Sequence, residues 1–192
     1  MDGNNNIVQM KGKRQKLRLF VAILLNDPVK DGLCQAIHEL ENAALRGNFT
    51  RRENLHLTLA FLGETSRWKD ILQAMEKVNS RLFPLVVQGL GKFQRGAAGI
   101  YWAGIQKSPQ LIALQSNLCR ELSLSGFSLE QRAYQPHLTL GREVILREDF
   151  EEAVFQKSVP PLSMEVRGMS LMRSERIDGR LVYTEVDAKQ FD

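Results

Sequence analysis

Apolar and polar positions along the chain recur with two periods, one typical of strands and one typical of helices. Short apolar or alternating runs predict strands over residues 17–25, 54–63, 85–90, 99–105, 137–141, 162–173 and 180–186. Apolar residues at helical spacing predict helices capped at Asp27, Ser66 and Ser108, and a short helix over 148–155. This order of elements predicts an α+β fold with antiparallel strand pairs and helices packed outside.

Prolines and glycines set the expected boundaries of these elements. Asp27 followed by Pro28 suits an N-cap and a first helical residue, and Ser108 followed by Pro109 repeats the signal. The first helix is predicted to end at Gly47, with an inner face of Val29, Leu33, Ile37, Leu40 and Leu45. A glycine-rich connection over 91–98 and a hairpin turn over 177–179 are predicted to join neighbouring strands.

Two of the three histidines stand in the same four-residue word. The words beginning at His56 and His137 both read HLTL, lie 81 residues apart and fall on predicted strands. Because side chains alternate across a strand, the histidine and threonine of each word face one way and its leucines face the other. Each strand is therefore predicted to present leucines to a core and an imidazole with a hydroxyl to a polar site.

Two imidazoles and two hydroxyls suit the cleavage of a phosphodiester by water. One group must take a proton from the nucleophile, and another must give a proton to the leaving oxygen. Histidine does both near neutral pH because its ordinary pKa is ~6.5. The hydroxyls of Thr58 and Thr139 can hold phosphoryl oxygens while charge builds. A single such word favours a structural histidine, whereas two identical copies favour a catalytic site.

A metal site is the rival interpretation of the two histidines. Catalytic zinc usually has three protein ligands, and the chain contains no HxH or HExxH word. Cys34 and Cys119 stand far apart and outside any CxxC pattern, which favours two buried free thiols. We therefore expect no metal and no cofactor. We interpret His38 as a residue on a helix face without a catalytic role.

The net charge of +4 comes from the start of the chain. Residues 1–18 hold five basic groups and one acidic group, so the remainder is neutral. The pI of 9.2 therefore gives no indication that the folded body binds a polyanion. We expect 1–16 to form a mobile polar tail. The longest apolar run, 19–25, is shorter than the ~20 residues of a membrane span, and no signal peptide is recognised, which favours a cytoplasmic protein.

Longer words around the repeated motif resemble a known family. They are RLFVAI at 18–23, ENLHLTLAFLGE at 53–64, IYWAGI at 100–105 and YQPHLTLGR at 134–142. With these words the chain resembles the two-histidine (2H) phosphoesterase superfamily and, within it, the RNA 2′,3′-cyclic phosphodiesterases, also called 2′-5′ RNA ligases. The resemblance extends from about Arg18 to Val186. It implies one bilobal, duplicated domain over 17–192, with two antiparallel sheets facing a central cleft and helices packed outside.

The resemblance also implies roles for the residues of the motifs. His56 would be the proton donor to the leaving oxygen, and His137 the proton acceptor that activates water. Thr58 and Thr139 would hold the phosphate, and Arg142 either neutralises it or is a surface arginine. Two aromatic residues, Tyr134 and Phe20, are candidates to stack on a base, although core packing is the favoured interpretation of both.

Two classes of function remain open on the sequence alone. The first is metal-independent hydrolysis of RNA 2′,3′-cyclic phosphodiester ends to 2′-phosphomonoesters, with the reverse 2′-5′ ligation left undecided. The second is a nucleotide- or RNA-binding protein on the same scaffold without turnover. The intact motifs favour the first. The expected partner is RNA or a nucleotide with a 2′,3′-cyclic phosphate, and we expect a monomer that does not bind membranes.

Overall fold

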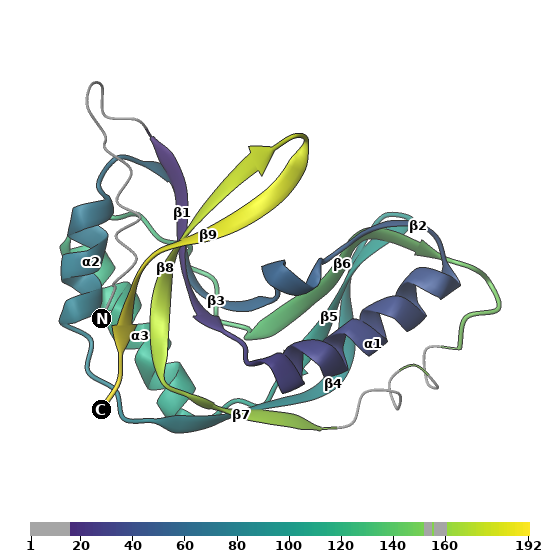
Figure 1. Cartoon of the computed structure of the whole chain (residues 1–192), viewed down its shortest axis with the longest axis horizontal. Helices are drawn as coiled ribbons and strands as arrows, with labels where there is room; N and C mark the ends of the chain where they lie inside the picture. The colour runs from purple at the N-terminus through teal and green to yellow at the C-terminus, as the bar shows by residue number, and fades with distance from the viewer. Residues whose placement is uncertain (1–15, 152–154, 156–160) are drawn as a thin grey trace, which may run out of the picture.

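Two antiparallel sheets dominate the structure (Figure 1), a computed structural model that describes residues 16–151, 155 and 161–192. The first sheet consists, in order, of β3 (His56–Thr65), β1 (Leu17–Leu24), β8 (Gly168–Ile177) and β9 (Arg180–Gln190). The second consists of β2 (Ala44–Phe49), β6 (His137–Leu146), β5 (Ala98–Ile105), β4 (Phe83–Arg95) and β7 (Leu162–Val166). The helical elements described in full are α1 (Asp27–Ala43), α2 (Trp68–Glu76), α3 (Pro109–Leu124) and the 3₁₀ turn η1 (Arg52–Asn54). The α+β prediction with antiparallel sheets is therefore confirmed.

The two sheets repeat one plan, in which a strand leads into a capped helix and then into a motif strand. In the first copy β1 leads into α1 and pairs antiparallel with β3, so that Leu24 faces His56. In the second copy β5 leads into α3 and pairs antiparallel with β6, so that Gly104 faces His137. Each motif histidine is thus the first residue of its strand. It lies opposite the end of the strand that precedes the helix.

The helices α1 and α3 are exchanged between the sheets. Although α1 follows β1 of the first sheet, it packs against β2, β6 and β7 of the second. Although α3 follows β5 of the second sheet, it packs against β3 of the first and against α2. The buried face of α1 consists of Val29, Leu33, Ala36, Ile37 and Leu40, and that of α3 of Leu111, Leu114, Leu118 and Leu122. One continuous apolar core therefore joins both sheets.

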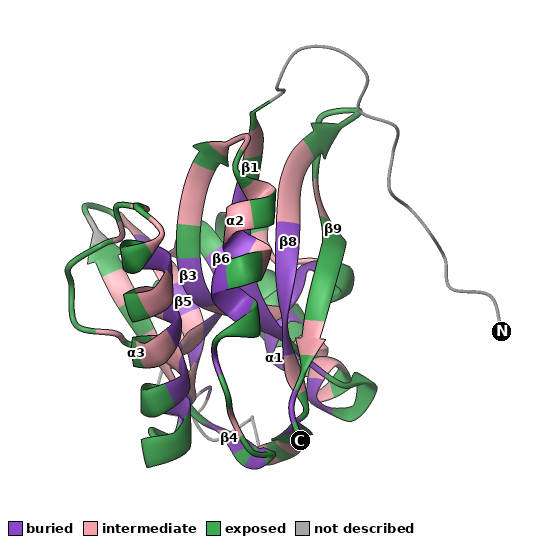
Figure 2. Ribbon diagram, turned by 90° about the vertical axis from the view of Figure 1, so that its left-hand side faces the viewer, coloured by how far each residue is buried: buried purple, intermediate pink, exposed green. Residues whose placement is uncertain are grey.

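The leucines of the two motifs belong to this core. Leu57, Leu138 and Leu140 are fully buried, and Leu59 is nearly so. The alternation predicted from the sequence is confirmed, because the histidines and threonines between them remain partly exposed. Burying a leucine side chain contributes about 1.5–3 kcal/mol. These residues therefore fix the register in which the imidazoles face away from the core. Figure 2 shows buried segments concentrated along the middle of β3 and β8.

The predicted boundaries of the helices needed correction. Asn26, not Asp27, caps α1: its side-chain oxygen accepts the Val29 amide at 3.1 Å. At α2, the hydroxyl of Thr65 rather than Ser66 accepts a nearby amide, that of Arg67. The cap at Ser108 is confirmed, since its hydroxyl accepts the Leu111 amide at 3.2 Å.

A strand was missed directly after α1. The helix ends at Ala43, and residues 44–49 form β2, so the predicted extension to Gly47 is wrong. Leu45, expected on the inner helix face, is 69% exposed. The reason is tertiary: β2 pairs with the edge of β6, and this satisfies backbone groups that a further helical turn would have satisfied internally.

Three further predictions differ from the structure. The glycine-rich segment 91–98 is mostly strand, because β4 runs to Arg95 and meets β5 through a tight turn. The strand predicted over 162–173 is two strands, β7 and β8, which belong to different sheets. Of the helix predicted over 148–155, residues 148–151 are not helical, whereas Phe155 is helical and its amide donates to the carbonyl oxygen of Glu151 at 3.1 Å. Residues 152–154 lie outside the described residues. The hairpin turn at Asp178 and Gly179 is confirmed, with φ of 49° and 77°.

Two smaller expectations concern cysteines and membranes. Cys34 and Cys119 are free thiols, as predicted, although both are only partly buried. Within the described part of the chain, none of the helices has the length and apolar character needed to cross a membrane. The tail predicted for 1–16 lies, apart from its last residue, outside the described residues.

Candidate active site

Each motif imidazole is oriented by an equivalent contact with the backbone carbonyl two residues before it. Nδ1 of His56 lies 2.7 Å from the carbonyl oxygen of Asn54, and Nδ1 of His137 lies 2.8 Å from that of Gln135. A carbonyl oxygen can only accept, so each Nδ1 carries a proton and donates it. The opposite nitrogen, Nε2, is therefore unprotonated in each neutral ring. It can accept a proton or, once protonated, deliver one.

The two motifs meet in one site. The strands β3 and β6 contact each other, and the Tyr134 hydroxyl, just before β6, donates to the carbonyl oxygen of Thr58 at 3.0 Å. Burial lowers the pKa of His56, the carbonyl of Asn54 opposes this shift, and the charges of Arg142 and His137 lower the pKa further. Such electrostatic effects decline with distance. The second motif is therefore close enough to act on the imidazole of the first.

The threonines and Arg142 make hydrogen-bond contacts within the two motifs. The Thr58 hydroxyl lies 3.0 Å from Nε2 of His56, and Nη2 of Arg142 donates to the hydroxyl of Thr139 at 3.4 Å. Thr58 and Thr139 are partly buried, whereas Arg142 is exposed. The structure thus gathers all five residues that the sequence singled out. Their combination offers two proton carriers, two hydroxyl donors and one fixed positive charge.

Aromatic rings line this site, and of those described below only Phe20 was considered as a site residue from the sequence. The centroids of Phe20 and Tyr183 lie 4.8 and 5.1 Å from the ring of His56. Those of Phe93 and Trp102 lie 5.4 and 6.2 Å from the ring of His137. Phe20 is only 3% exposed, which confirms the core-packing interpretation for that residue. Trp102 falls on the strand predicted over 99–105, whereas Phe93 falls in the segment predicted to be a glycine-rich connection. Only the register of β4, β5 and β6 brings both rings to His137.

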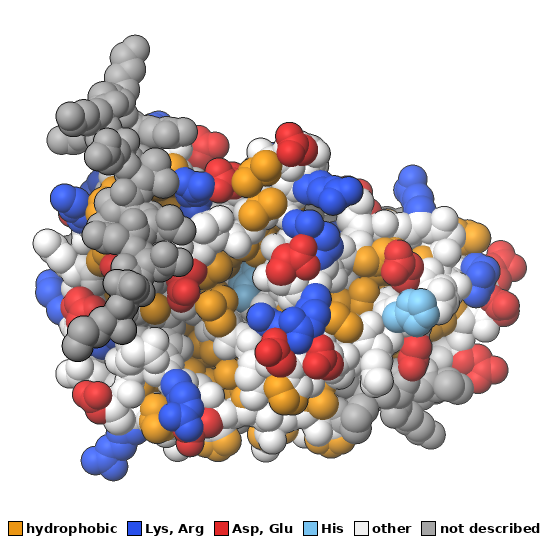
Figure 3. All heavy atoms as spheres, in the orientation of Figure 1, with side chains coloured by type: hydrophobic (Ala, Val, Ile, Leu, Met, Phe, Trp, Pro, Cys, Tyr) orange, Lys and Arg blue, Asp and Glu red, His pale blue; other side chains and the backbone are white. Residues whose placement is uncertain are grey.

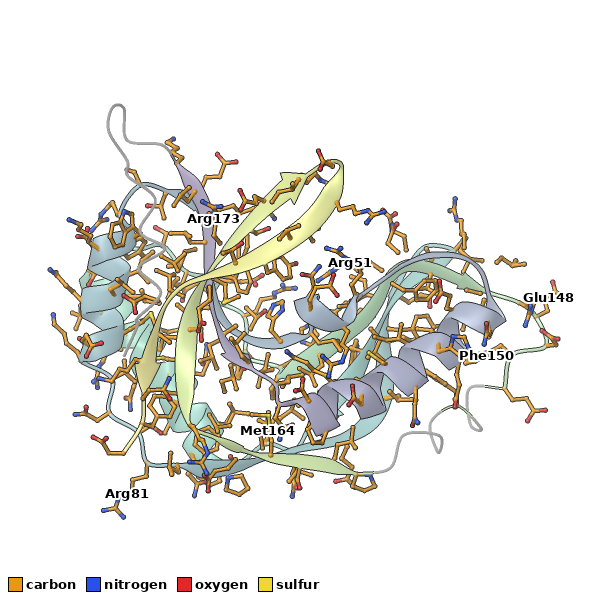
Figure 4. All side chains as sticks on the ribbon, viewed as in Figure 1. Arg51, Arg81, Glu148, Phe150, Met164 and Arg173 are labelled. Carbon is orange, nitrogen blue, oxygen red and sulfur yellow. The ribbon has the colours of Figure 1, made fainter. Side chains whose placement is uncertain are left out.

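The turn η1 attaches the first motif to two other parts of the molecule. Arg52 contacts Asp27 and Asp31 of α1 at 2.8 Å each. Arg51 and Asn54 both donate to the carbonyl oxygen of Leu181, at the tip of the β8–β9 hairpin. Figure 4 shows Arg51 between this hairpin and η1, and Figure 3 shows basic side chains gathered between the hairpin tip and α1. The segment that carries His56 is therefore held from both sides.

The site also bears on the rival interpretation of the two histidines as metal ligands. No group of three or more His, Cys, Asp or Glu side chains is placed to hold a metal ion within 16–151, 155 and 161–192. His38 lies on the exposed surface of α1, where Nε2 is 3.1 Å from the Asn42 amide. Its position on a helix face is the one predicted from the sequence.

The fold and this pair of motifs define a member of the 2′-5′ RNA ligase superfamily. The model of that family matches residues 29–178, so the chain belongs to it. The RNA 2′,3′-cyclic phosphodiesterase of Thermotoga maritima is 30% identical over 182 residues, which are 92% of this chain and 96% of the relative. The protein of the same description from Escherichia coli K12 is 33% identical over 178 residues, 87% of this chain and 92% of the relative.

Solved structures agree with this assignment. The crystal structure of E. coli LigT complexed with 3′-AMP matches with a TM-score of 0.74 and 28% identity, covering 92% of this chain and 99% of that chain. The fold of this chain is therefore similar to that of the solved protein over nearly its whole length.

Proposed function

We propose that this chain hydrolyses RNA 2′,3′-cyclic phosphodiester ends to 2′-phosphomonoesters by acid–base catalysis with two histidines and without a metal. The supporting observation is the matched orientation of the two imidazoles. Both donate Nδ1–H to the carbonyl two residues earlier, and both offer Nε2 for proton transfer. Relatives described as RNA 2′,3′-cyclic phosphodiesterases, similar over most of their length, support the choice of substrate.

The reaction needs one proton removed and one supplied. Nε2 of His137 takes a proton from water, whose oxygen forms a bond to phosphorus. The bond between phosphorus and the ribose 3′ oxygen breaks, and Nε2 of protonated His56 gives its proton to that oxygen. The product carries a 2′-phosphate and a 3′-hydroxyl. General acid–base steps of this kind contribute about 10²–10⁴-fold each.

Charge at the phosphate is balanced by the remaining site residues. Thr58 and Thr139 donate hydrogen bonds to the phosphoryl oxygens, and Arg142 supplies positive charge beside Thr139. The lowered pKa of His56 means that this ring is mostly neutral at pH 7 in the free protein. An arriving phosphate carries negative charge, which favours the protonated imidazole. Substrate binding thus prepares the proton donor.

Product analysis tests this proposal directly. An oligonucleotide with a 2′,3′-cyclic phosphate end is incubated with the protein in EDTA, and the ends are identified. We expect a 2′-phosphate, together with losses of about 10²–10⁴-fold in His56→Ala and His137→Ala. The losses in the double variant should not multiply, because both residues serve one transition state.

Each other outcome contradicts a specific part of the proposal. A 3′-phosphate product would reverse the roles of the two histidines. Loss of activity in EDTA, restored by zinc or manganese, would establish metal catalysis. Tight binding without any product would identify a nucleotide-binding protein on the same scaffold.

A further inference from the structure

The two copies of the motif differ at one cross-strand position. Thr58 faces Ala22 across β3 and β1, whereas Thr139 faces Trp102 across β6 and β5. Residues directly opposite in an antiparallel pair lie on the same face of the sheet. Ala22 is fully buried, whereas Trp102 is partly exposed. The second copy therefore presents a large aromatic ring where the first presents a methyl group.

Trp102 lies over a strand position that has no side chain. A Cβ added to Gly91, its partner on β4, would lie 2.3 Å from Cζ2 of the indole ring. Phe93 packs beside the indole, with centroids 5.2 Å apart and ring planes inclined by 33°. Both rings are partly exposed, and both contact the imidazole of His137. We call Phe93 and Trp102 the aromatic shelf.

The direction of the reaction decides which part of the substrate can reach this shelf. In an in-line displacement at phosphorus, the nucleophile and the leaving oxygen lie on opposite sides. His56, as the proton donor, lies on the side of the ribose that carries the cyclic phosphate. His137, as the base, lies on the side of the nucleophile. The shelf adjoins His137, so it lies where the nucleophile enters. A water molecule has no aromatic or apolar group that could stack on these two rings.

We propose that the aromatic shelf binds the base of an RNA nucleoside whose 5′-hydroxyl replaces water as the nucleophile. This inference rests on the proposed function, because it uses His137 as the base. The 5′-hydroxyl gives its proton to Nε2 of His137 and forms a bond to phosphorus. The bond to the 3′ oxygen breaks, and that oxygen takes the proton of His56. The product is a 2′-5′ phosphodiester, and the reverse reaction cleaves it.

Substitution of the shelf tests the assignment. Base stacking on an aromatic side chain is weakened about 5- to 150-fold when the ring is removed. In Trp102→Leu, transfer of a 2′,3′-cyclic end to a 5′-hydroxyl oligonucleotide should therefore fall by this factor relative to hydrolysis of 2′,3′-cyclic AMP. Trp68→Leu on α2 is the matched control, because its ring packs with Lys69 away from the motifs, and the ratio should not change.

A binding measurement covers the case in which Trp102→Leu is unstable. The chain has two tryptophans, so Trp68→Phe leaves Trp102 as the only tryptophan, and excitation at the red edge of the absorption band, where tyrosine does not absorb, reports on this residue alone. Adenosine has a base and a 5′-hydroxyl but no phosphate. We expect it to quench this fluorescence, and to do so equally when saturating 2′-AMP occupies the His56 side of the site. Trp102→Phe, which retains Trp68, should show no quenching.

Three results would overturn the proposal. An equal loss of transfer and hydrolysis in Trp102→Leu would place the terminal base on the shelf. Competition between 2′-AMP and adenosine for quenching would lead to the same conclusion. Absence of quenching would show that the rings bind no base. Failure of the proposed function is distinguishable from all three, since it would appear as absent hydrolysis of 2′,3′-cyclic AMP by the unsubstituted protein.

Discussion

Asn54 connects His56 to a hairpin that is distant in the sequence. Its carbonyl oxygen lies 2.7 Å from Nδ1 of His56, while its side-chain amide donates to the carbonyl oxygen of Leu181 at 3.0 Å. Asn54 is 7% exposed, and within the described residues its Oδ1 is buried without a hydrogen-bond partner. One residue thus orients the imidazole with its backbone and holds the β8–β9 hairpin with its side chain.

Removal of the Asn54 side chain should reduce stability more than it alters the histidine. Asn54→Ala loses the bond to Leu181 but keeps the carbonyl that orients His56, so we expect a loss of about 0.5–1.5 kcal/mol in the free energy of unfolding. Asn54→Asp should lose more, because it places a buried negative charge against the Leu181 carbonyl oxygen, which cannot donate to it. Urea denaturation measures both, and kcat at neutral pH should remain far above that of His56→Ala. Equal kcat in Asn54→Ala and His56→Ala would contradict this division of roles.

The pH profile should reveal how His56 becomes protonated. Burial lowers its pKa in the free protein, so the apparent pKa of the alkaline limb of kcat/KM should lie below the ordinary histidine value of ~6.5. Bound phosphate raises the pKa again, so the alkaline limb of kcat should lie at higher pH. Steady-state kinetics with 2′,3′-cyclic AMP from pH 4.5 to 9 measure both limbs. A kcat limb at or below that of kcat/KM would be inconsistent with His56 as the donor.

Stability should depend on pH through the same residue. The pKa of His56 is lower in the folded state than in the unfolded state, so the unfolded chain binds more protons between the two values. The contribution of neutral His56 to the free energy of unfolding is fully present above pH ~6.5 and is lost as the pH falls through that value toward the folded pKa. His56→Gln should remove this part of the pH dependence of the free energy of unfolding. His38→Gln, on the exposed face of α1, is the control and should leave it intact.

The threonine hydroxyls should contribute to the transition state rather than to folding. Thr58→Val and Thr139→Val preserve shape but remove a donor, and each should lower kcat/KM by roughly 10- to 150-fold, about 1.5–3 kcal/mol for a bond to a charged oxygen. The corresponding serine variants retain the hydroxyl and should recover most of the activity. Melting temperatures of all four variants provide the check on folding. Activity of the valine variants equal to that of the serine variants would exclude hydroxyl donation.

Arg142 should influence activity partly through His56. Its positive charge lowers the pKa of that imidazole, so Arg142→Gln should raise the pKa of His56, while Arg142→Lys should not. NMR titration of His56 in the free protein measures this shift. Both variants should also bind phosphate more weakly, because lysine lacks the two-pronged geometry of arginine. An unchanged His56 pKa in Arg142→Gln would place the guanidinium outside the site.

Local signals in the sequence were sufficient for the motif strands and for the inner faces of the helices, apart from Leu45 beyond the end of α1. The period of two around His56 and His137 and the leucine stripe of α3 both depend on residues close in sequence. The strand β2 was missed because its pairing with β6 joins segments about a hundred residues apart. The break between β7 and β8 was missed for a similar reason, since the apolar pattern continues while the chain passes from one sheet to the other.

The residues of the candidate site were likewise predictable only where they stand close together in the sequence. The repeated word identified both histidines and both threonines, because duplication is visible without any knowledge of the fold. The aromatic shelf was not predictable, since Phe93 and Trp102 reach His137 only through the register of three strands. The contact of Asn54 with Leu181, 127 residues away, left no local signal at all.

The exchange of α1 and α3 between the sheets has a consequence for synthesis on the ribosome. α1 emerges early, but the strands that cover its apolar face end with β7, at Val166. β1, the first strand made, pairs with β8, which is among the last. The nascent chain therefore exposes apolar surface until nearly all of it has left the exit tunnel. Chaperones that shield such segments should accelerate its maturation, whereas truncation before Ile177 should leave an aggregation-prone chain.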